Sequence, residues 1–148
     1  VRQLQPWHEN LAKRQVKSPK VYLSDSGLLH ALLGIESLGE LESHPRLGAS
    51  WEGFALEAVI RALGARPEEC YFWATHAGAE LDLLIIKGGK RLGFEFKRAE
   101  APALTASMRI TLKDLKLDRL DVVHAGRETF PLAERVRAIP LGQIRWTG

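Results

Sequence analysis

The sequence contains little cysteine and no long apolar run, and each absence excludes a class of protein. The single cysteine, Cys70, excludes an internal disulfide and a cysteine-based zinc cluster, a pattern typical of a reducing compartment. No apolar run approaches the roughly 18 to 20 residues that span a membrane. Charged residues also occupy the N-terminal stretch where a signal peptide has its apolar region. We therefore expect a cytoplasmic protein that is not exported and has no membrane partner.

Several catalytic signatures are also missing. The chain has no G-x-x-x-x-G-K-[ST] phosphate-binding loop, and Gly88-Gly89-Lys90 is only a hairpin turn. The five histidines show no paired spacing of the kind that zinc ligands have. No serine or cysteine nucleophile with an accompanying base is recognisable. The chain starts at Val1 and its only methionine is Met108, so we expect it to be a piece of a longer protein.

The composition that remains is that of a folded domain. The chain has 148 residues, of which 45% are hydrophobic, and this is enough for one domain with a real core. Lysine and arginine number 21 against 18 aspartate and glutamate residues, a formal net charge of +3. This charge permits a nucleic-acid partner without requiring one.

The chain divides into two regions, residues 1–45 and residues 46–148. Residues 1–20 lack periodicity, carry several basic side chains and suggest an arm or linker. A short strand is expected at Val21–Leu23, and Asp25 lies in a turn that caps a short helix ending at Gly34. We expect residues 1–45 to be a truncated appendage of the domain formed by residues 46–148.

From residue 47 onward the pattern predicts the order helix, three strands, helix, strand. Apolar residues recur at three- and four-residue spacing over Leu47–Leu63, which predicts a helix with one buried stripe. The other expected elements are strands at Tyr71–Thr75, Leu81–Ile86 and Leu92–Lys97, a helix at Ala103–Leu117, a strand at Leu120–His124 and a short strand near Ala138–Leu141. This order predicts an α/β domain with a central mixed sheet flanked by helices.

The second and third of these strands predict a polar site. Gly88-Gly89 is a strong two-residue turn signal, and pairing Lys87 with Lys90 fixes the hairpin register. That register places Asp82 across from Glu95 and Glu80 across from Lys97, all on one face at one end of the hairpin. The other face is wholly apolar, with Leu81, Leu83, Ile85, Leu92, Phe94 and Phe96.

Two carboxylates facing each other repel unless a cation lies between them. Hard oxygen ligands suit Mg²⁺ or Mn²⁺, which also accept phosphate oxygens, so phosphodiester hydrolysis is the natural chemistry. Lys97 could orient the attacking water or neutralise charge on the phosphorus centre. On the Leu47–Leu63 helix, Glu52 is expected to reach the same end of the sheet, whereas Glu57 is expected on the solvated side.

These residues carry a resemblance to a known superfamily. A helix glutamate followed by Glu80-Leu81-Asp82 and Glu95-Phe96-Lys97 on successive strands resembles the PD-(D/E)XK nucleases, and within them the archaeal-type Holliday junction resolvases. More closely, the run from Ser18 to Leu29, S-P-K-V-Y-L-S-D-S-G-L-L, with Trp51-Glu52-Gly53-Phe54 further on, looks like the C-terminal DUF4143 region of prokaryotic AAA-type ATPases. That likeness covers most of the chain. One departure from the superfamily pattern is Leu81, which stands where a proline often precedes the aspartate.

The resemblance implies a restriction-endonuclease-like core of order αβββαβ with a catalytic set of Glu52, Asp82, Glu95 and Lys97. It implies Asp82 and Glu95 as ligands of Mg²⁺ or Mn²⁺, Lys97 as the catalytic lysine and Glu52 as an auxiliary acid. The expected protein is a metal-dependent nuclease-like domain that acts on or binds DNA. Its N-terminal ATPase module is expected to be missing from this chain, and a homo-oligomer is possible.

Three other interpretations stay open. Lys97 and Arg98 could neutralise the acids as a structural salt-bridge network. The domain could be a catalytically inactive module of the ATPase that binds nucleic acid or protein. The N-terminal arm could exchange with a neighbouring copy in an assembly, and its basic side chains suit either a phosphate backbone or a solvated linker.

Overall fold

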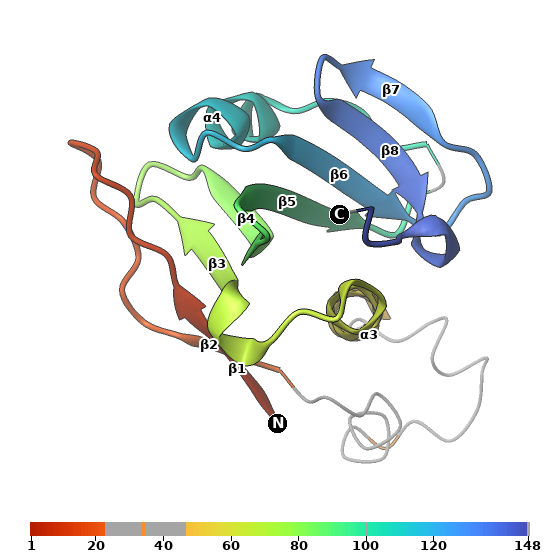
Figure 1. Ribbon diagram of the computed structural model, residues 1–148, viewed down its shortest axis with the longest axis horizontal. Coiled ribbons are helices and arrows are strands. Elements are labelled where there is room, and N and C mark those ends of the chain that lie inside the picture. The colour runs from red at the N-terminus through yellow and green to blue at the C-terminus, as the bar shows by residue number, and fades with distance from the viewer. Residues whose placement is uncertain (23–33, 35–46, 100, 148) are drawn as a thin grey trace.

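The computed structural model describes residues 1–22, 34, 47–99 and 101–147. These residues form an α/β fold around one eight-stranded mixed sheet with the strand order β2-β1-β3-β4-β5-β6-β8-β7 (Figure 1). The strands are β1 (Arg2–Pro6), β2 (Lys20–Tyr22), β3 (Cys70–Ala74), β4 (Glu80–Lys87), β5 (Lys90–Lys97), β6 (Arg119–His124), β7 (Phe130–Ala133) and β8 (Val136–Pro140). The predicted α/β class and the central mixed sheet are confirmed.

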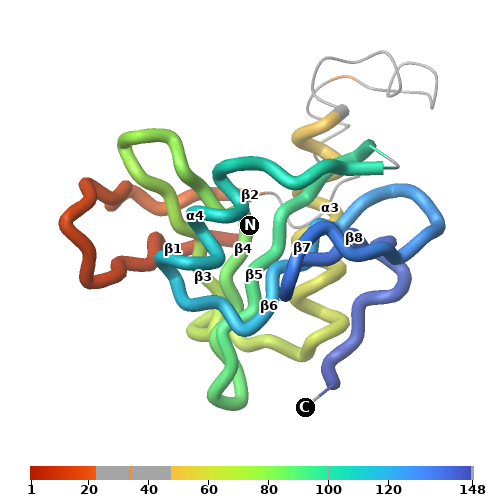
Figure 2. The backbone as a smooth tube through the Cα atoms, turned by 90° about the horizontal axis from the view of Figure 1, so that it is seen from above, coloured from red at the N-terminus to blue at the C-terminus, as the bar shows by residue number. Residues whose placement is uncertain are grey.

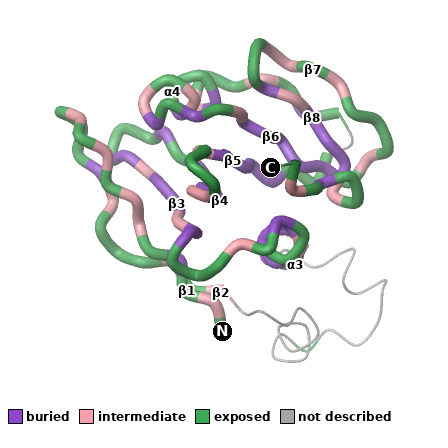
Figure 3. Tube along the Cα trace, viewed as in Figure 1, coloured by how far each residue is buried: buried purple, intermediate pink, exposed green. Residues whose placement is uncertain are grey.

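Two α-helices in the described part of the chain cover opposite faces of the sheet (Figures 1 and 2). Helix α3 (Leu47–Leu63) packs Leu56, Val59 and Leu63 against one face. Helix α4 (Ala106–Asp114) packs on the other face, and its N-cap is Thr105, whose hydroxyl accepts a hydrogen bond from the Met108 amide. Figure 3 shows the buried side of α3 turned toward the sheet and its exposed side turned away. Each face of the sheet therefore has its own apolar core.

Most of the predicted elements from residue 47 onward are present, and α3 has the bounds that the apolar stripe predicts. The observed order α3-β3-β4-β5-α4-β6 is the predicted one. Strand β7 was missed because it alternates weakly and contains Pro131, which edge strands tolerate. Short 3₁₀ turns at Pro67–Glu69 and Leu141–Gln143 complete the described elements.

The N-terminal residues 1–22 are part of the sheet rather than a free arm. Strand β1 pairs parallel with β3 and antiparallel with β2. The side chain of Leu4 is only 1% exposed and lies in the core under α3. Because the pairs between β1 and β3 join residues 66 positions apart, such as Gln5 and Tyr71, this pairing leaves no local pattern in the sequence.

Other expectations for the N-terminal region fall partly outside the described residues. Strand β2 lies one residue earlier than the predicted Val21–Leu23. The short helix predicted before Gly34, with Asp25 in its capping turn, lies outside the described residues. Gly34 itself has φ of 75°, the left-handed conformation expected of a helix-ending glycine. Among the described residues, no helix is long and apolar enough to cross a membrane.

Candidate functional site

The candidate site starts from the β4–β5 hairpin, whose predicted register is confirmed over five residue pairs. The ladder runs from Lys87–Lys90 at the turn to Leu83–Phe94, and Gly88 and Gly89 both have positive φ, 59° and 75°. On the other side of β4, however, Tyr71 pairs with Leu84 while Trp73 pairs with Leu81. Two residues of β4, Asp82 and Leu83, thus lie opposite the single residue Phe72 of β3, which defines a β-bulge.

The bulge corrects the predicted arrangement of side chains. Leu83 packs under α3, but Leu81 packs in the opposite core with α4, although strict alternation would put both on one face. The prediction that Leu81 shares the apolar face of Leu83 is therefore wrong. The extra residue shifts the alternation at Asp82, so the Asp82 side chain is placed by the bulge rather than by the hairpin register.

Asp82 and Glu95 lie next to each other where β4 and β5 separate. Beyond the Leu83–Phe94 pair, the Phe96 amide donates to Asp82 Oδ2 at 2.9 Å, so a side chain takes the place of a main-chain acceptor. The carboxyl groups of Asp82 and Glu95 share a hydrogen bond. The two acids predicted to face each other are thus in contact, by way of the bulge.

The environment of this pair strongly favours one retained proton. Burial raises the pKa of Glu95 first, and the negative charge of Asp82 raises it further. Burial also raises the pKa of Asp82, although the Phe96 amide partly offsets that effect. The two carboxyl groups therefore favour a state in which one proton is shared between them.

Glu52 on α3 approaches the pair from the α3 side of the sheet. Burial and the charge of Asp82 raise the pKa of Glu52 to about 6, and Lys20 on β2 opposes this shift. The hydroxyl of Tyr22 lies within hydrogen-bonding reach of Glu52, and burial followed by the Glu52 charge raises its pKa. The site therefore includes Lys20 and Tyr22, which the sequence reasoning missed as site residues although both belong to the S-P-K-V-Y run.

Lys97 and Glu80 complete the set at the exposed rim. Lys97 ends β5, is exposed, and opposes the rise in the pKa of Glu95 by its positive charge. Glu80 starts β4 and is also exposed, and its charge acts on Glu52, Asp82 and Glu95. Among the described residues, no ion pair joins Lys97 or Arg98 to Glu80, Asp82 or Glu95. This arrangement does not match a salt-bridge network.

Glu57 departs from expectation and is not solvated. It is buried and forms an ion pair with Arg2 of β1. The partner lies 55 residues away in the sequence, so the helical pattern could not show it. Glu57 thus anchors the N-terminal strand to α3 and lies outside the candidate site.

The carboxylate oxygens of Asp82 and Glu95 could supply two of the ligands of a metal ion. Within the described part of the chain, no group of three or more His, Cys, Asp and Glu side chains is arranged to hold a metal ion. Asp82 and Glu95 nevertheless supply two hard oxygen donors in contact, and a divalent ion could replace the proton between them. Mg²⁺ usually takes only one or two carboxylates and keeps several waters, so two protein ligands suffice.

Comparison with known families identifies the larger part of the chain. The profile described as "Domain of unknown function (DUF4143)" matches residues 47–144, about two thirds of the chain. The chain belongs to the DUF4143 family. A second profile, described as "Domain of unknown function (DUF8612)", matches residues 1–39. The DUF4143 match contains α3, both acids of the pair and Lys97, whereas Lys20 and Tyr22 lie in the second match.

Two curated relatives of this DUF4143 protein come from mycobacteria. One is an uncharacterized protein of Mycobacterium tuberculosis and the other an uncharacterized protein of Mycobacterium bovis. Each is 50% identical over 148 residues, which is 100% of this chain and 33% of the relative. The chain thus spans about a third of the length of these relatives. No solved structure matches the chain.

Proposed function

We propose that this DUF4143 domain is a metal-dependent nuclease-like module that acts on DNA. The observation that carries the proposal is the contact between Asp82 and Glu95 at the point where β4 and β5 separate. Two acids in contact where β4 and β5 separate repel each other unless a proton or a cation joins them, so the pair is a candidate binding site for a divalent ion. The charged end of an otherwise apolar hairpin is a candidate for function.

Each residue of the set has a role in this proposal. Asp82 and Glu95 would hold Mg²⁺ or Mn²⁺, which when bound polarises a phosphate oxygen and acidifies a coordinated water. Lys97 lies at the rim and would offset the negative charge that builds on the phosphate during attack. Glu52, with a pKa near neutrality, would accept a proton or hydrogen-bond a water beside Asp82. Tyr22 and Lys20 would hold Glu52 in place.

The order of the helices and strands and the resemblance to ATPase C-terminal regions extend the same proposal. The order α3-β3-β4-β5-α4-β6 and the position of the acids support a restriction-endonuclease-like core of the PD-(D/E)XK type. The resemblance to the C-terminal regions of AAA-type ATPases supports a cytoplasmic protein whose ATPase module lies outside this chain. The relatives are about three times as long, which leaves room for such a module.

A second candidate function is an inactive interaction module of the same ATPase. The observation that favours it is the hydrogen bond between the acids, because a shared proton satisfies the pair without any metal. The two functions differ in one measurable property. The nuclease requires a divalent ion at Asp82 and Glu95, and the interaction module does not.

Cleavage of end-labelled branched and linear DNA tests the nuclease proposal. The chain is incubated with Mg²⁺ or Mn²⁺, with the chelator EDTA, and as the variants Asp82→Asn and Lys97→Met. We expect metal-dependent cleavage that EDTA abolishes and that each variant reduces by about 10² or more. Cleavage that persists in Asp82→Asn would identify a contaminating nuclease, and no cleavage of any substrate would favour the interaction module.

A further inference from the structure

A basic cleft of about 480 Å³ lies between the loop before β2 and the loop before β4. It is formed by the loop that follows β1 and by the loop between β3 and β4, which run side by side in Figures 1 and 2. The side chains that line it include five that are basic or imidazole: His8, Lys13, Arg14, Lys17 and His76. None of the described residues that line it is acidic. The cleft therefore presents a surface suited to an anion.

The two loops are fixed to the sheet, so the cleft is preformed. The His76 amide donates to the Arg14 carbonyl at 2.9 Å, and the Val16 amide donates to the Ala74 carbonyl at 2.8 Å. Buried Gln15 accepts from the indole of Trp73 at 2.8 Å and donates to the Glu9 carbonyl at 2.8 Å. A surface held in this way loses little conformational entropy when it binds a ligand.

Of the three lysine and arginine side chains that line the cleft, two form no ion pair with a described residue. Lys13 forms an ion pair with Asp114 of α4. Arg14 and Lys17 are exposed and take part in no ion pair with any residue that the structure describes. Two neighbouring cations left free in a concave surface repel each other, and an anionic ligand would relieve that repulsion.

The position of the cleft links it to the acid pair. Strand β4 is antiparallel to β3 and β5, and Ala74 pairs with Glu80, so the loop after β3 lies at the end of the sheet where β4 begins. This is the end that contains Asp82 and Lys97. Lys20, whose charge acts on both Asp82 and Glu52, lies three residues beyond Lys17. Cations thus extend from the cleft to the acid pair.

We propose that this cleft binds the phosphodiester backbone of a DNA strand and directs it toward Asp82 and Glu95, with Arg14 and Lys17 as the phosphate contacts. The inference rests on the proposed function for the choice of DNA. The cleft recognises phosphate charge, so the binding is independent of base sequence and weakens with salt.

Fluorescence anisotropy with a labelled DNA oligonucleotide tests this inference on the 148-residue chain. Measurement in EDTA removes divalent ions, so that neither metal binding nor cleavage contributes. The double variant Arg14→Ala/Lys17→Ala is expected to weaken binding roughly tenfold or more and to lower the slope of log K against log salt by about 2. Both side chains are exposed, so the variant is expected to retain its fold.

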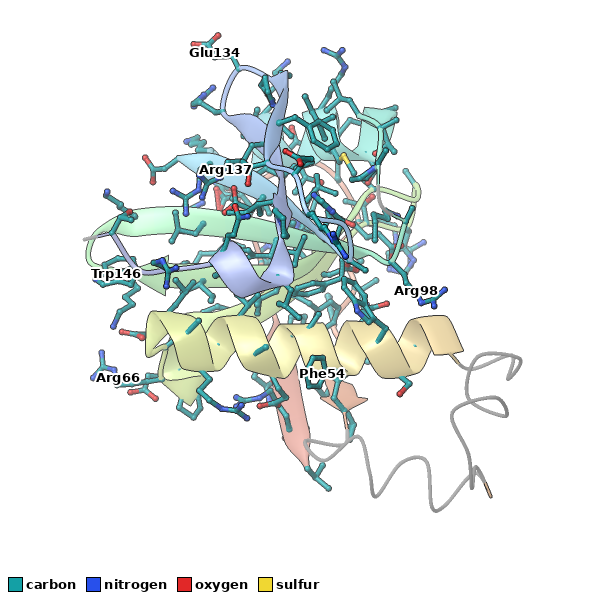
Figure 4. All side chains as sticks on the ribbon, turned by 90° about the vertical axis from the view of Figure 1, so that its right-hand side faces the viewer. Phe54, Arg66, Arg98, Glu134, Arg137 and Trp146 are labelled. Atoms are coloured by element: carbon teal, nitrogen blue, oxygen red, sulfur yellow. The ribbon has the colours of Figure 1, made fainter. Side chains whose placement is uncertain are left out.

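A matched control removes the same net charge elsewhere. Lys90 and Arg145 are exposed and lie at the hairpin-turn end of the sheet, where Trp146 approaches Gly88. Figure 4 shows Trp146 and Arg98 on opposite sides of the view, and Arg98 directly follows Lys97, the last residue of β5. Lys90→Ala/Arg145→Ala is expected to keep both the affinity and the salt slope of the wild type.

The outcomes separate this inference from the proposed function. If the cleft variant loses binding while the wild type cleaves nothing, the inference stands and the nuclease proposal fails. If both double variants bind alike, or if the wild type binds no DNA, the inference is overturned whatever the cleavage assay gives. Binding to an RNA oligonucleotide with none to DNA would also overturn it.

Discussion

At the scale of single residues, the acid pair and Lys97 have separable roles. Glu95 is buried, Asp82 is half-buried and the two are in contact, whereas Lys97 is exposed at the rim and forms no ion pair with a described residue. A change at Lys97 should therefore alter chemistry while leaving metal affinity in place. A change in either acid should alter both.

Replacing Lys97 by methionine tests this separation. We expect Lys97→Met to lower kcat for DNA cleavage by about 10² to 10³ because charge on the phosphate is no longer offset. Metal affinity should stay within about threefold of the wild type. The control is Arg98→Met, which removes the adjacent exposed cation and should change kcat little. Equal losses in the two variants would assign Lys97 a general electrostatic role rather than a catalytic one.

The protonation of Glu95 predicts how stability depends on pH. Its pKa in the folded protein lies above the ordinary value of 4.5, so the folded state binds this proton more tightly than the unfolded state. That contribution to stability is fully present below pH 4.5 and is lost as the pH rises toward the folded pKa. Glu95→Gln keeps a neutral hydrogen-bond donor at every pH.

Thermal unfolding in EDTA checks this dependence. We expect Glu95→Gln to be more stable than the wild type at pH 7 by about 1 to 2 kcal/mol, or roughly 3 to 6 °C in Tm. At pH 4 the two proteins should unfold at nearly the same temperature. Glu128→Gln, at an exposed acid, is the control. A Glu95→Gln variant that is less stable at pH 7 would show that Glu95 is ionised there.

At the scale of elements, the site depends on how the start of β4 is held. The hydroxyl of Ser107 on α4 accepts from the Glu80 amide at 3.0 Å and contacts the Glu80 carbonyl at 3.3 Å. Thr111 also reaches the Glu80 carbonyl at 3.4 Å. Helix α4 thus fixes the strand end that carries Asp82.

Removing the Ser107 hydroxyl should loosen that strand end. We expect Ser107→Ala to lower the local opening free energy at the Glu80 amide by about 1 kcal/mol, which speeds hydrogen exchange there roughly fivefold. Thr129→Ala, which removes a hydroxyl bonded to Gln143, is the control and should leave Glu80 unchanged. Unchanged exchange in Ser107→Ala would mean that β4 is held without α4.

The elements also show what the sequence could and could not predict. Helix α3 and the hairpin ladder followed from local signals, the apolar stripe and Gly88-Gly89. The bulge at Asp82 did not, because it arises from the pairing of β4 with β3 rather than from the hairpin. The predicted contact between Asp82 and Glu95 is present, but the β-bulge in β4 makes it, and the two residues are not a cross-strand pair of the hairpin. Lys20 and Tyr22 reach the site from β2, and no local pattern indicates this.

At the scale of the whole molecule, one sheet runs through both family matches. Strands β1 and β2 come from the region matched by the second profile, and β3 to β8 from the DUF4143 region. Leu4 of β1 lies in the same core as α3. Residues 1–22 and the DUF4143 domain should therefore unfold together.

Leu4→Ala tests this coupling. Truncation of a fully buried leucine leaves a cavity, so we expect a loss of about 2 to 4 kcal/mol in the free energy of unfolding of the whole chain, in a single transition. Gln3→Ala, at an exposed position of the same strand, should change stability by less than about 0.5 kcal/mol. Two separate transitions, or no change in Leu4→Ala, would show an independent appendage.

If Asp82 and Glu95 together hold a divalent ion, calorimetric titration of Mn²⁺ into the chain should detect its binding. We expect one site in the wild type, with an affinity for Mn²⁺ that rises with pH because the proton shared by the two acids must leave. We expect no binding in Asp82→Asn. No heat of binding in the wild type at millimolar Mn²⁺ and pH 8, or equal binding in Asp82→Asn, would contradict this expectation.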